Sequence, residues 1–296
     1  MSRGALLPGL FVILWCTGYL VVRLAMPDAG PVRFLAWRFG VAALLLAVAA
    51  WPLRAPWAGR TVDYAHMAIV GLLVHGIGLG GVWVGLDLGV EAGVAALVMG
   101  TQPLLTAALA IGLIGERIDR RMAAGLALGF LGVTLVIHHK LGGVGDPTGL
   151  AAVVVAVVAM TLGVLYQKRR CAHIDLVTGN AVQLGAAGAA CLAVAWWIDD
   201  RPVAWTLQIF AVLGWSVLVL SIVATLLLYR MLRRGDASRV ASLLYLVPPV
   251  TALLAWAVFG ETLGTLAIAG MAFTAVGVAL VASGPASPGR REKEGA

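Results

Sequence analysis

Charged side chains are scarce in this chain of 296 residues: Asp, Glu, Lys and Arg together make up 12% of it, while 61% of the residues are hydrophobic. A chain of this length forms one or two soluble domains only if it has enough polar surface to cover them. The composition therefore excludes a cytosolic enzyme, a secreted module and a disordered scaffold. It predicts a protein that lies in a bilayer.

The sequence also lacks the signatures of several catalytic classes. It has no Walker motif, no His-Glu-x-x-His and no Gly-x-Ser-x-Gly, so ATP-driven pumping, metalloprotease and serine-hydrolase chemistry have no residues to carry them. The three cysteines, Cys16, Cys171 and Cys191, are far apart and show no metal or redox spacing. Residues 76–81 match the dinucleotide fingerprint formally, but no strand precedes them. We expect no enzyme activity, no cofactor and no metal site.

Long apolar runs bounded by charges or by Pro/Gly turns are the main feature that is present. About 20 residues cross the roughly 30 Å of bilayer hydrocarbon, and the chain has ten runs of this kind. They lie at 5–24, 33–52, 64–86, 92–114, 121–139, 149–168, 174–197, 208–231, 237–259 and 264–283. Each should be an α-helix, because lipid offers no partner for unpaired backbone groups. The expected fold class is an all-α integral membrane protein with ten transmembrane helices.

Basic residues are distributed unevenly between the predicted loops. If the N-terminus is cytoplasmic, the inner loops collect most of the 21 Lys and Arg residues, and most of the acidic loop residues fall outside. This positive-inside asymmetry predicts that both termini are cytoplasmic, in the inner membrane of a bacterial-type cell. Because the basic charge sets orientation, we expect no nucleic-acid partner.

The two halves of the chain repeat one another. Residues 91–136 can be laid over 236–281 without a gap, at an offset of 145 residues. The matches include Pro103 with Pro248 and the two Gly-Glu pairs that follow. Apolar composition alone explains matched Ala, Leu and Val, but not these residues in one register. Duplication is the simplest account.

Each repeat carries five spans, an odd number, so the second copy enters the membrane from the opposite side. We predict two inverted five-helix repeats, at 1–145 and 146–284, and a disordered cytoplasmic tail at 285–296. Inverted pairs are typical of secondary transporters. Glu116 would then lie inside and Glu261 outside, and we interpret both as helix-capping residues rather than proton carriers.

Two local motifs carry a family resemblance. Residues 113–117 read Leu-Ile-Gly-Glu-Arg at the end of the fourth span, with a copy that ends at Glu261, and residues 229–238 read Tyr-Arg-Met-Leu-Arg-Arg-Gly-Asp-Ala-Ser. With these motifs in two five-span halves, the chain resembles the drug/metabolite transporter superfamily, EamA type. It looks most like the amino-acid exporters, particularly the aromatic amino-acid exporter group. The resemblance implies a secondary transporter.

A permeation site should show polar or aromatic side chains near the midpoints of the spans, where lipid penalises them unless they face a cavity. Side chains of this kind converge on one depth and are the predicted substrate-binding residues: Trp15, Tyr19, His75, Gln102, Gln183 and Tyr245. The aromatic faces can stack a bulky side chain, while the amides and the imidazole hydrogen-bond an ammonium and a carboxylate. Packing, or a hydrogen bond to a neighbouring helix, is the structural alternative for each of them.

Prolines interrupt two spans. Pro103 lies in the fourth span, and Pro248 and Pro249 lie in the ninth, where each proline frees a backbone carbonyl. We interpret them as hinges or gates, or as positions that present a carbonyl to the substrate. Arg38, in the second span, either snorkels outward or attracts a carboxylate as an amino acid leaves.

The fifth and tenth spans are short of polar side chains at mid-depth. Their repeated glycines, Gly125 and Gly129 in one span and Gly270 and Gly277 in the other, favour close packing against neighbouring helices. We therefore expect these two spans to be peripheral. A homodimer formed through them is compatible with the sequence.

No acidic residue lies securely at the centre of any span, which argues against exchange of protons for cationic drugs through a buried glutamate. We predict an exporter of amino acids, including aromatic or bulky apolar ones, that works by alternating access. Its partners would be small-molecule metabolites and membrane lipid. The alternatives are a carrier of purines, nucleotide-sugars or other metabolites, and a non-transporting membrane receptor or assembly subunit.

The predicted topology can be tested with single cysteines and membrane-impermeant thiol reagents. Cysteines near Arg117 and Arg234 should react only from the cytoplasmic side, and those near Asp146 and Asp200 only from the outside, because an odd number of spans separates the two sets. Labelling at Arg117 and Glu261 from the same side would contradict the inverted repeat.

Overall fold

The computed structural model describes residues 3–90, 92–137, 146–198, 201–235, 237–251, 253 and 264–282. All regular secondary structure in this part of the chain is helical, as the sequence predicts, and no strand occurs there. Seven of the described helices are long and apolar enough to cross a membrane: Pro31–Ala50, Thr61–Asp87, Val94–Ile114, Pro147–Arg170, Leu176–Trp197, Leu207–Arg234 and Thr265–Ala282. A shorter apolar stretch, Leu7–Gly18, lies in the first helix.

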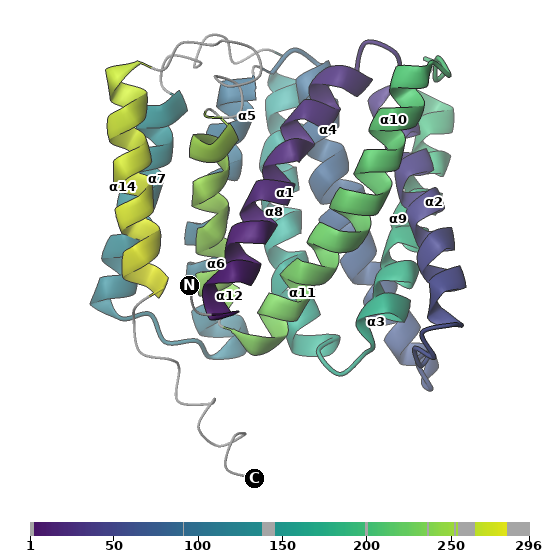
Figure 1. Cartoon of the computed structure of the whole chain (residues 1–296), viewed down its shortest axis with the longest axis horizontal. Helices are drawn as coiled ribbons and strands as arrows, with labels where there is room; N and C mark the ends of the chain where they lie inside the picture. The colour runs from purple at the N-terminus through teal and green to yellow at the C-terminus, as the bar shows by residue number, and fades with distance from the viewer. Residues whose placement is uncertain are drawn as a thin grey trace.

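The helices run as rods from one end of the bundle to the other (Figure 1). The first half contains α1 (Arg3–Ala25), α2 (Pro31–Ala50), α3 (Thr61–Gly71) continuing through the π-helix η1 (Leu72–Leu79) into α4 (Gly80–Asp87), then α5 (Ala92–Met99), α6 (Gln102–Ile114) and α7 (Arg120–Ile137). The second half contains α8 (Pro147–Arg170), α9 (Leu176–Ile198), α10 (Leu207–Trp215) continuing through the π-helix η3 (Ser216–Ala224) into α11 (Thr225–Arg234), then α12 (Ala237–Ser242), the 3-10 helix η4 (Leu243–Leu246) and α14 (Thr265–Ala282).

Basic loops gather at one end of the bundle. In Figure 1, α1 begins and α14 ends at the lower end, and the loops that follow α2, α6, α8 and α11 also lie there. These loops or the adjoining helix ends contain Arg54, Arg117, Arg170 and Arg234. The structure thus segregates charge as the sequence predicts. Which face of the membrane this end meets stays a prediction.

Helices α7 and α14 pack side by side at one edge of the bundle (Figure 1). Their backbones approach so closely that a Cβ atom added at Gly132 would lie 2.6 Å from the carbonyl oxygen of Gly270. One added at Gly125 would lie 2.7 Å from the carbonyl oxygen of Gly277. Residue numbers along the interface therefore rise in α7 and fall in α14, so the two helices are antiparallel. Only glycine allows this approach of one backbone to another.

Helices α2 and α9 form a second close pair at the opposite edge (Figure 1). A Cβ atom at Gly188 would lie 3.0 Å from the backbone nitrogen of Gly40, and one at Gly185 would lie 3.8 Å from Cβ of Ala43. This pair is also antiparallel. Both edges of the bundle thus join a helix of the first half to a helix of the second half.

The glycines of residues 76–85 bring the third rod against α8. A Cβ atom at Gly81 would lie 2.8 Å from the carbonyl oxygen of Ala152, and one at Gly85 would lie 2.9 Å from that of Gly149. Close helix packing therefore accounts for Gly78, Gly81 and Gly85, and the fingerprint-like spacing lies within helix and forms no phosphate-binding turn. The adjoining π-helix η1 was not predicted.

The glycine contact between α7 and α14 can be tested by adding one methyl group. Gly132→Ala should lower the free energy of unfolding in detergent by about 1–3 kcal/mol, because its Cβ would collide with Gly270 and Thr274. Gly112→Ala is the matched control, since a Cβ there meets nothing within 4 Å and alanine favours helix. Thermal melting measures both variants, and equal melting temperatures would contradict the packing.

Candidate functional site

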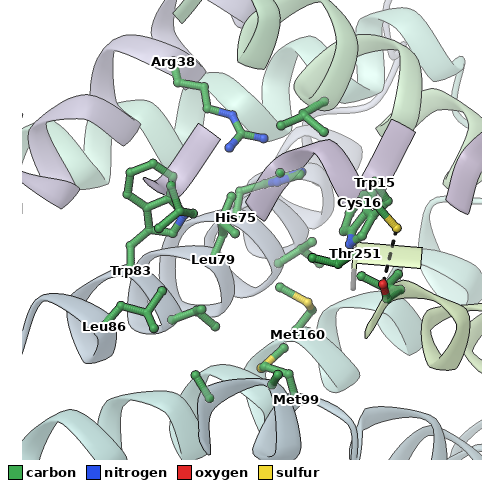
Figure 2. Close-up of a pocket in the computed structure, with 18 of the residues that line it drawn as sticks. Trp15, Cys16, Arg38, His75, Leu79, Trp83, Leu86, Met99, Met160 and Thr251 are labelled. Atoms are coloured by element: carbon green, nitrogen blue, oxygen red, sulfur yellow. Dashed lines mark hydrogen bonds between the residues drawn. The ribbon is translucent and has the colours of Figure 1, made fainter. Parts of the chain in front are cut away.

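A cavity of about 550 Å³ lies inside the bundle (Figure 2). Its walls come from α1, α2, η1, α4 and α5 of the first half, from α8, η3 and α11 of the second, and from the helical stretch that follows η4. It reaches from mid-depth to the upper end, where Met26, Leu86 and Val90 line it. Among the described residues, neither α7 nor α14 contributes to the lining, in keeping with their expected peripheral place.

Below the cavity, the bundle is filled by side chains. Phe11, Met67, Leu165, Tyr229 and Leu232 are fully buried in one apolar cluster. These residues come from α1, α3, α8 and α11, so the cluster joins helices from both halves. The cavity is therefore closed toward the lower end of the bundle.

Arg38 and His75 are the basic side chains in the described lining of the cavity. Arg38 is only 7% exposed, and its Nε donates a hydrogen bond of 2.8 Å to Oγ of Ser221. Nε2 of the buried His75 lies 3.4 Å from the hydroxyl oxygen of Tyr229. Figure 2 shows the Arg38 guanidinium above the imidazole, both reaching inward. Arg38 therefore does not snorkel to the surface, and it presents its charge inside the bundle.

Both π-helices contribute to this site. His75 belongs to η1, while Ser221 and Leu220 belong to η3. Side chains bond to the altered backbone of η3: Nδ2 of Asn180 donates to the carbonyl of Ser221 at 3.1 Å, and the hydroxyl of Thr225 donates to the carbonyl of Leu220 at 3.0 Å. Such π segments occur often at functional sites, because they re-aim side chains. Here one of them fixes Ser221, the partner of Arg38.

Aromatic and sulfur-containing side chains make up much of the remaining wall. The Trp15 ring lies 5.1 Å from that of Phe11, and Trp83 stacks on Phe34 with ring centroids 5.3 Å apart. Met99 and Met160 approach from the other side (Figure 2). Rigid rings facing flexible thioethers form an apolar chamber that can adapt to the shape of a bulky group.

Of the six predicted substrate-binding residues, Trp15 and His75 line the cavity. Arg38, for which snorkelling and attraction of a carboxylate were the two interpretations, lines it too. The side chain of Tyr19 lies outside the described part of the structure. The lining also includes Cys16, whose thiol donates to the carbonyl of Val247 at 3.5 Å. Sequence reasoning passed over Cys16 because it belongs to no metal or redox spacing.

The other predicted binding residues are buried elsewhere among the helices. Nε2 of Gln183 donates to Oε1 of Gln167 at 2.9 Å, which joins α9 to α8. Gln102 is buried at the start of α6 and is not part of the lining. Tyr245 is buried with its ring against Gly129 of α7. The structure therefore brings Trp15 and His75 to the cavity and does not bring these three residues there.

The prolines do mark interruptions. Pro103 is the second residue of α6, which follows a turn at 100–101 after α5. Pro248 and Pro249 lie in a helical stretch that resumes after η4. None of the three lines the cavity, so their contribution is to the path of the chain.

A buried carboxylate joins the two halves at the lower end. Gly115, with φ of 68°, ends α6 in the left-handed region, and the next residue is Glu116. The Glu116 carboxylate accepts hydrogen bonds from Nζ of Lys168 and the backbone N–H of Ala237, both at 2.6 Å, and from the hydroxyl of Ser238 at 2.7 Å. Glu116 therefore does act as a cap, but it caps α12 of the other half.

The surroundings of Glu116 also shift its pKa. Burial alone would raise the pKa of Glu116, but the hydrogen bonds from Lys168 and Ser238 outweigh this effect and lower the pKa. Glu261, its copy, lies outside the described residues.

Comparison with known proteins identifies the family to which this fold belongs. The model of the EamA-like transporter family matches residues 2–138 and again residues 147–283. The chain belongs to this family. The two matches cover nearly the whole sequence as two copies of one unit, and members of the family are transporters, not enzymes.

Relatives of known name extend this finding. The chain is 31% identical to a probable terminal-alkyne amino-acid exporter of Streptantibioticus cattleyicolor, covering 92% of this chain and 91% of the relative. It is 26% identical to a probable amino-acid metabolite efflux pump of Salmonella typhimurium, covering 94% of each chain. An uncharacterized inner membrane transporter of Escherichia coli is 27% identical over 93% of this chain and 90% of the relative. The protein is thus a multi-pass membrane transporter with relatives in bacterial inner membranes.

A solved crystal structure has the same fold, with a TM-score of 0.77 and 22% sequence identity. The match covers 94% of this chain and 96% of the other chain. At this identity the likeness concerns the fold alone, and it supports the arrangement of helices described above.

The Glu116 cluster of this EamA-like transporter predicts a pH-dependent stability. Glu116→Gln should lower the free energy of unfolding at neutral pH by about 1–3 kcal/mol, because charge-assisted hydrogen bonds are lost and Lys168 loses its partner. Since folding lowers the pKa of Glu116, its contribution is present above the unfolded-state pKa and is lost as pH falls through the folded-state pKa.

Denaturant unfolding at several pH values measures this effect. The difference between wild type and Glu116→Gln should shrink under acid conditions. Asp87→Asn is the control, since Asp87 forms an ion pair with Arg201 between partly exposed side chains, at 2.6 Å, and its loss should cost under about 1 kcal/mol. A Glu116 difference that grows as pH falls would contradict the assignment.

Proposed function

We propose that the protein is a secondary transporter that exports amino acids, including aromatic or bulky apolar ones, by alternating access. The observation that carries this proposal is a cavity built from both repeats, which reaches one end of the bundle and is closed toward the other. We further propose ten transmembrane helices in two inverted repeats, 1–145 and 146–284, with both termini in the cytoplasm.

The inversion is supported by contacts between equivalent helices. The sequence offset of 145 residues relates Gly125 to Gly270 and Gly132 to Gly277. The observed contacts are Gly125 with Gly277 and Gly132 with Gly270. Applying the offset to both residues of one contact gives the residues of the other contact, with the two helices exchanged. Such exchange is what a two-fold relation produces. Because equivalent helices lie antiparallel, their repeats cross the bundle in opposite directions.

The π-helices support the same relation. The offset carries Leu72–Leu79 onto residues 217–224, which fall within η3 at Ser216–Ala224. An irregular backbone feature at equivalent positions is not an effect of apolar composition. The two repeats therefore share a π-helix at the same position, which the number of identical residues between them does not reveal. Both π-helices place residues at the cavity.

The charge distribution supports an orientation. With the basic lower end in the cytoplasm, the cavity faces the outside and the Glu116 cluster lies at the cytoplasmic end. Opening inward then requires α6, α8 and α12 to separate there. The offset also relates Glu116 to Glu261 and Lys168 to Arg23, so the sequence holds the charged pair twice.

The nature of the lining supports the substrate class. A volume of about 550 Å³ lies within the usual range of small-molecule sites, and few polar groups interrupt the apolar wall. A bulky apolar side chain can pack between the tryptophans and methionines, while His75 and Arg38 meet the polar end. The names of two relatives, both amino-acid exporters or efflux pumps, agree with this class.

Flux in proteoliposomes tests the proposal. Labelled phenylalanine or leucine should exchange across the membrane, and Trp15→Ala and His75→Ala should each lower this flux several-fold, because both residues line the cavity. An exposed counterpart serves as the control: Trp197→Ala should keep wild-type flux, because its side chain lies at the surface. Flux of purines or nucleotide-sugars instead of amino acids, or no flux of any metabolite, would overturn the proposal.

A further inference from the structure

The Arg38 guanidinium is a buried charge without a counter-ion. Its Nε bonds to the neutral hydroxyl of Ser221, and its guanidinium carbon lies 5.6 Å from the centroid of the Phe39 ring. Among the described residues, the hydrogen bond of the guanidinium is this one, through Nε, and no hydrogen bond or ion pair is found for its two terminal amino groups. These groups lie at the wall of the cavity. The side chain is thus more than nine-tenths buried, and its free donors face the space that a ligand would occupy.

Carboxylates are absent from the described lining of the cavity. The acidic residues of this part of the structure lie in loops or near helix ends, and those buried there are engaged: Asp63 with His173, and Glu116 with Lys168. A guanidinium kept away from water is costly unless an anion pairs with it. Because the protein supplies no such anion in the described residues, the site is complete only with an anionic ligand.

The remaining lining is asymmetric toward the two charges of an amino acid. One guanidinium is present for a carboxylate, and it can donate two parallel hydrogen bonds from its terminal nitrogens. For an ammonium, the described lining offers neutral groups such as the hydroxyls of Thr225 and Thr251. The body of the ligand would meet tryptophan and methionine side chains.

We infer that this site selects its substrates by one carboxylate, bound by Arg38, and by an apolar body, and that it does not require an ammonium group. The substrate class is therefore monocarboxylates with a bulky apolar group, of which amino acids are one part. This inference rests on the proposed transport function and deepens it. Ser221 is a positioning residue, because its hydroxyl holds the guanidinium through Nε and leaves the terminal nitrogens for the ligand.

Compounds that share one apolar body separate the two charges. In proteoliposomes, 3-phenylpropanoate, which lacks the ammonium, should inhibit labelled phenylalanine flux within about threefold of unlabelled phenylalanine. Phenethylamine and phenylalanine amide, which lack the carboxylate, should inhibit at least about tenfold more weakly. Strong inhibition by the amine together with none by 3-phenylpropanoate would overturn the inference, although phenylalanine flux would still stand.

Variants of Arg38 locate the recognition. Arg38→Gln should raise the KM for phenylalanine about tenfold or more and remove the preference for carboxylates, and Arg38→Lys should retain part of that preference. Ser221→Ala should raise KM by a smaller factor while leaving the maximal rate near that of wild type. Arg201→Gln removes one positive charge at the exposed upper end, and it should behave as wild type. A carboxylate preference that persists in Arg38→Gln would overturn the assignment to Arg38.

Ligand-induced thermal stabilisation gives a second measurement that does not depend on flux. 3-Phenylpropanoate should raise the melting temperature of wild type and of Arg201→Gln, and have a much smaller effect on Arg38→Lys, which keeps the charge and so the folded state. Stabilisation by 3-phenylpropanoate without any amino-acid flux would uphold the carboxylate site and overturn amino-acid export. Equal stabilisation of wild type and Arg38→Lys would overturn the role of Arg38.

Discussion

The structure depends on the close antiparallel approach of helices across its two halves. In a bilayer, apolar side chains gain little by leaving lipid for one another, so association depends on dense packing and on contacts between backbones. At Gly132 and Gly270 on one edge, and at Gly40 and Gly188 on the other, the backbones nearly touch. These contacts fix the width of the bundle at its edges. Around the cavity, larger side chains such as Trp15, Trp83 and Met160 lie between the helices.

The cavity owes its polar character to a few residues held in place by unusual backbone. A regular helix would place the side chains of η1 and η3 at other angles around the axis, because a π-turn contains more residues than an α-turn. Bonds from Asn180 and Thr225 to carbonyls of η3 satisfy groups that lipid would leave unpaired. Ser221 is thereby fixed, and through it the charge of Arg38 is directed into the cavity. The site thus depends on α2, α9 and η3, which are far apart in the sequence.

The depth of a side chain in the bundle can be predicted from the sequence more readily than the direction in which it points. Apolar runs and midpoints place Trp15 and His75 at the level of the cavity, because position along a helix follows from counting residues. Which way a side chain faces depends on neighbours that the sequence does not identify. Gln183 has the right depth but faces Gln167, and Tyr245 fills the space that Gly129 leaves. The hydrogen bond from Arg38 to Ser221 joins residues that are 183 positions apart, and no local sequence pattern predicts it.

The difference between the glycine-packed interfaces and the cavity wall determines which parts of the molecule can move. Two backbones in contact through glycine have no side chains to rearrange, so a shift along such an interface brings main-chain atoms into collision. The cavity wall includes long side chains, such as Met99 and Met160, that change rotamer at small cost. A transporter must keep its two states within a few kcal/mol of each other for both to be populated. Rearrangement confined to the helices around the cavity, with the glycine-packed interfaces kept intact, changes few contacts and so keeps that difference small.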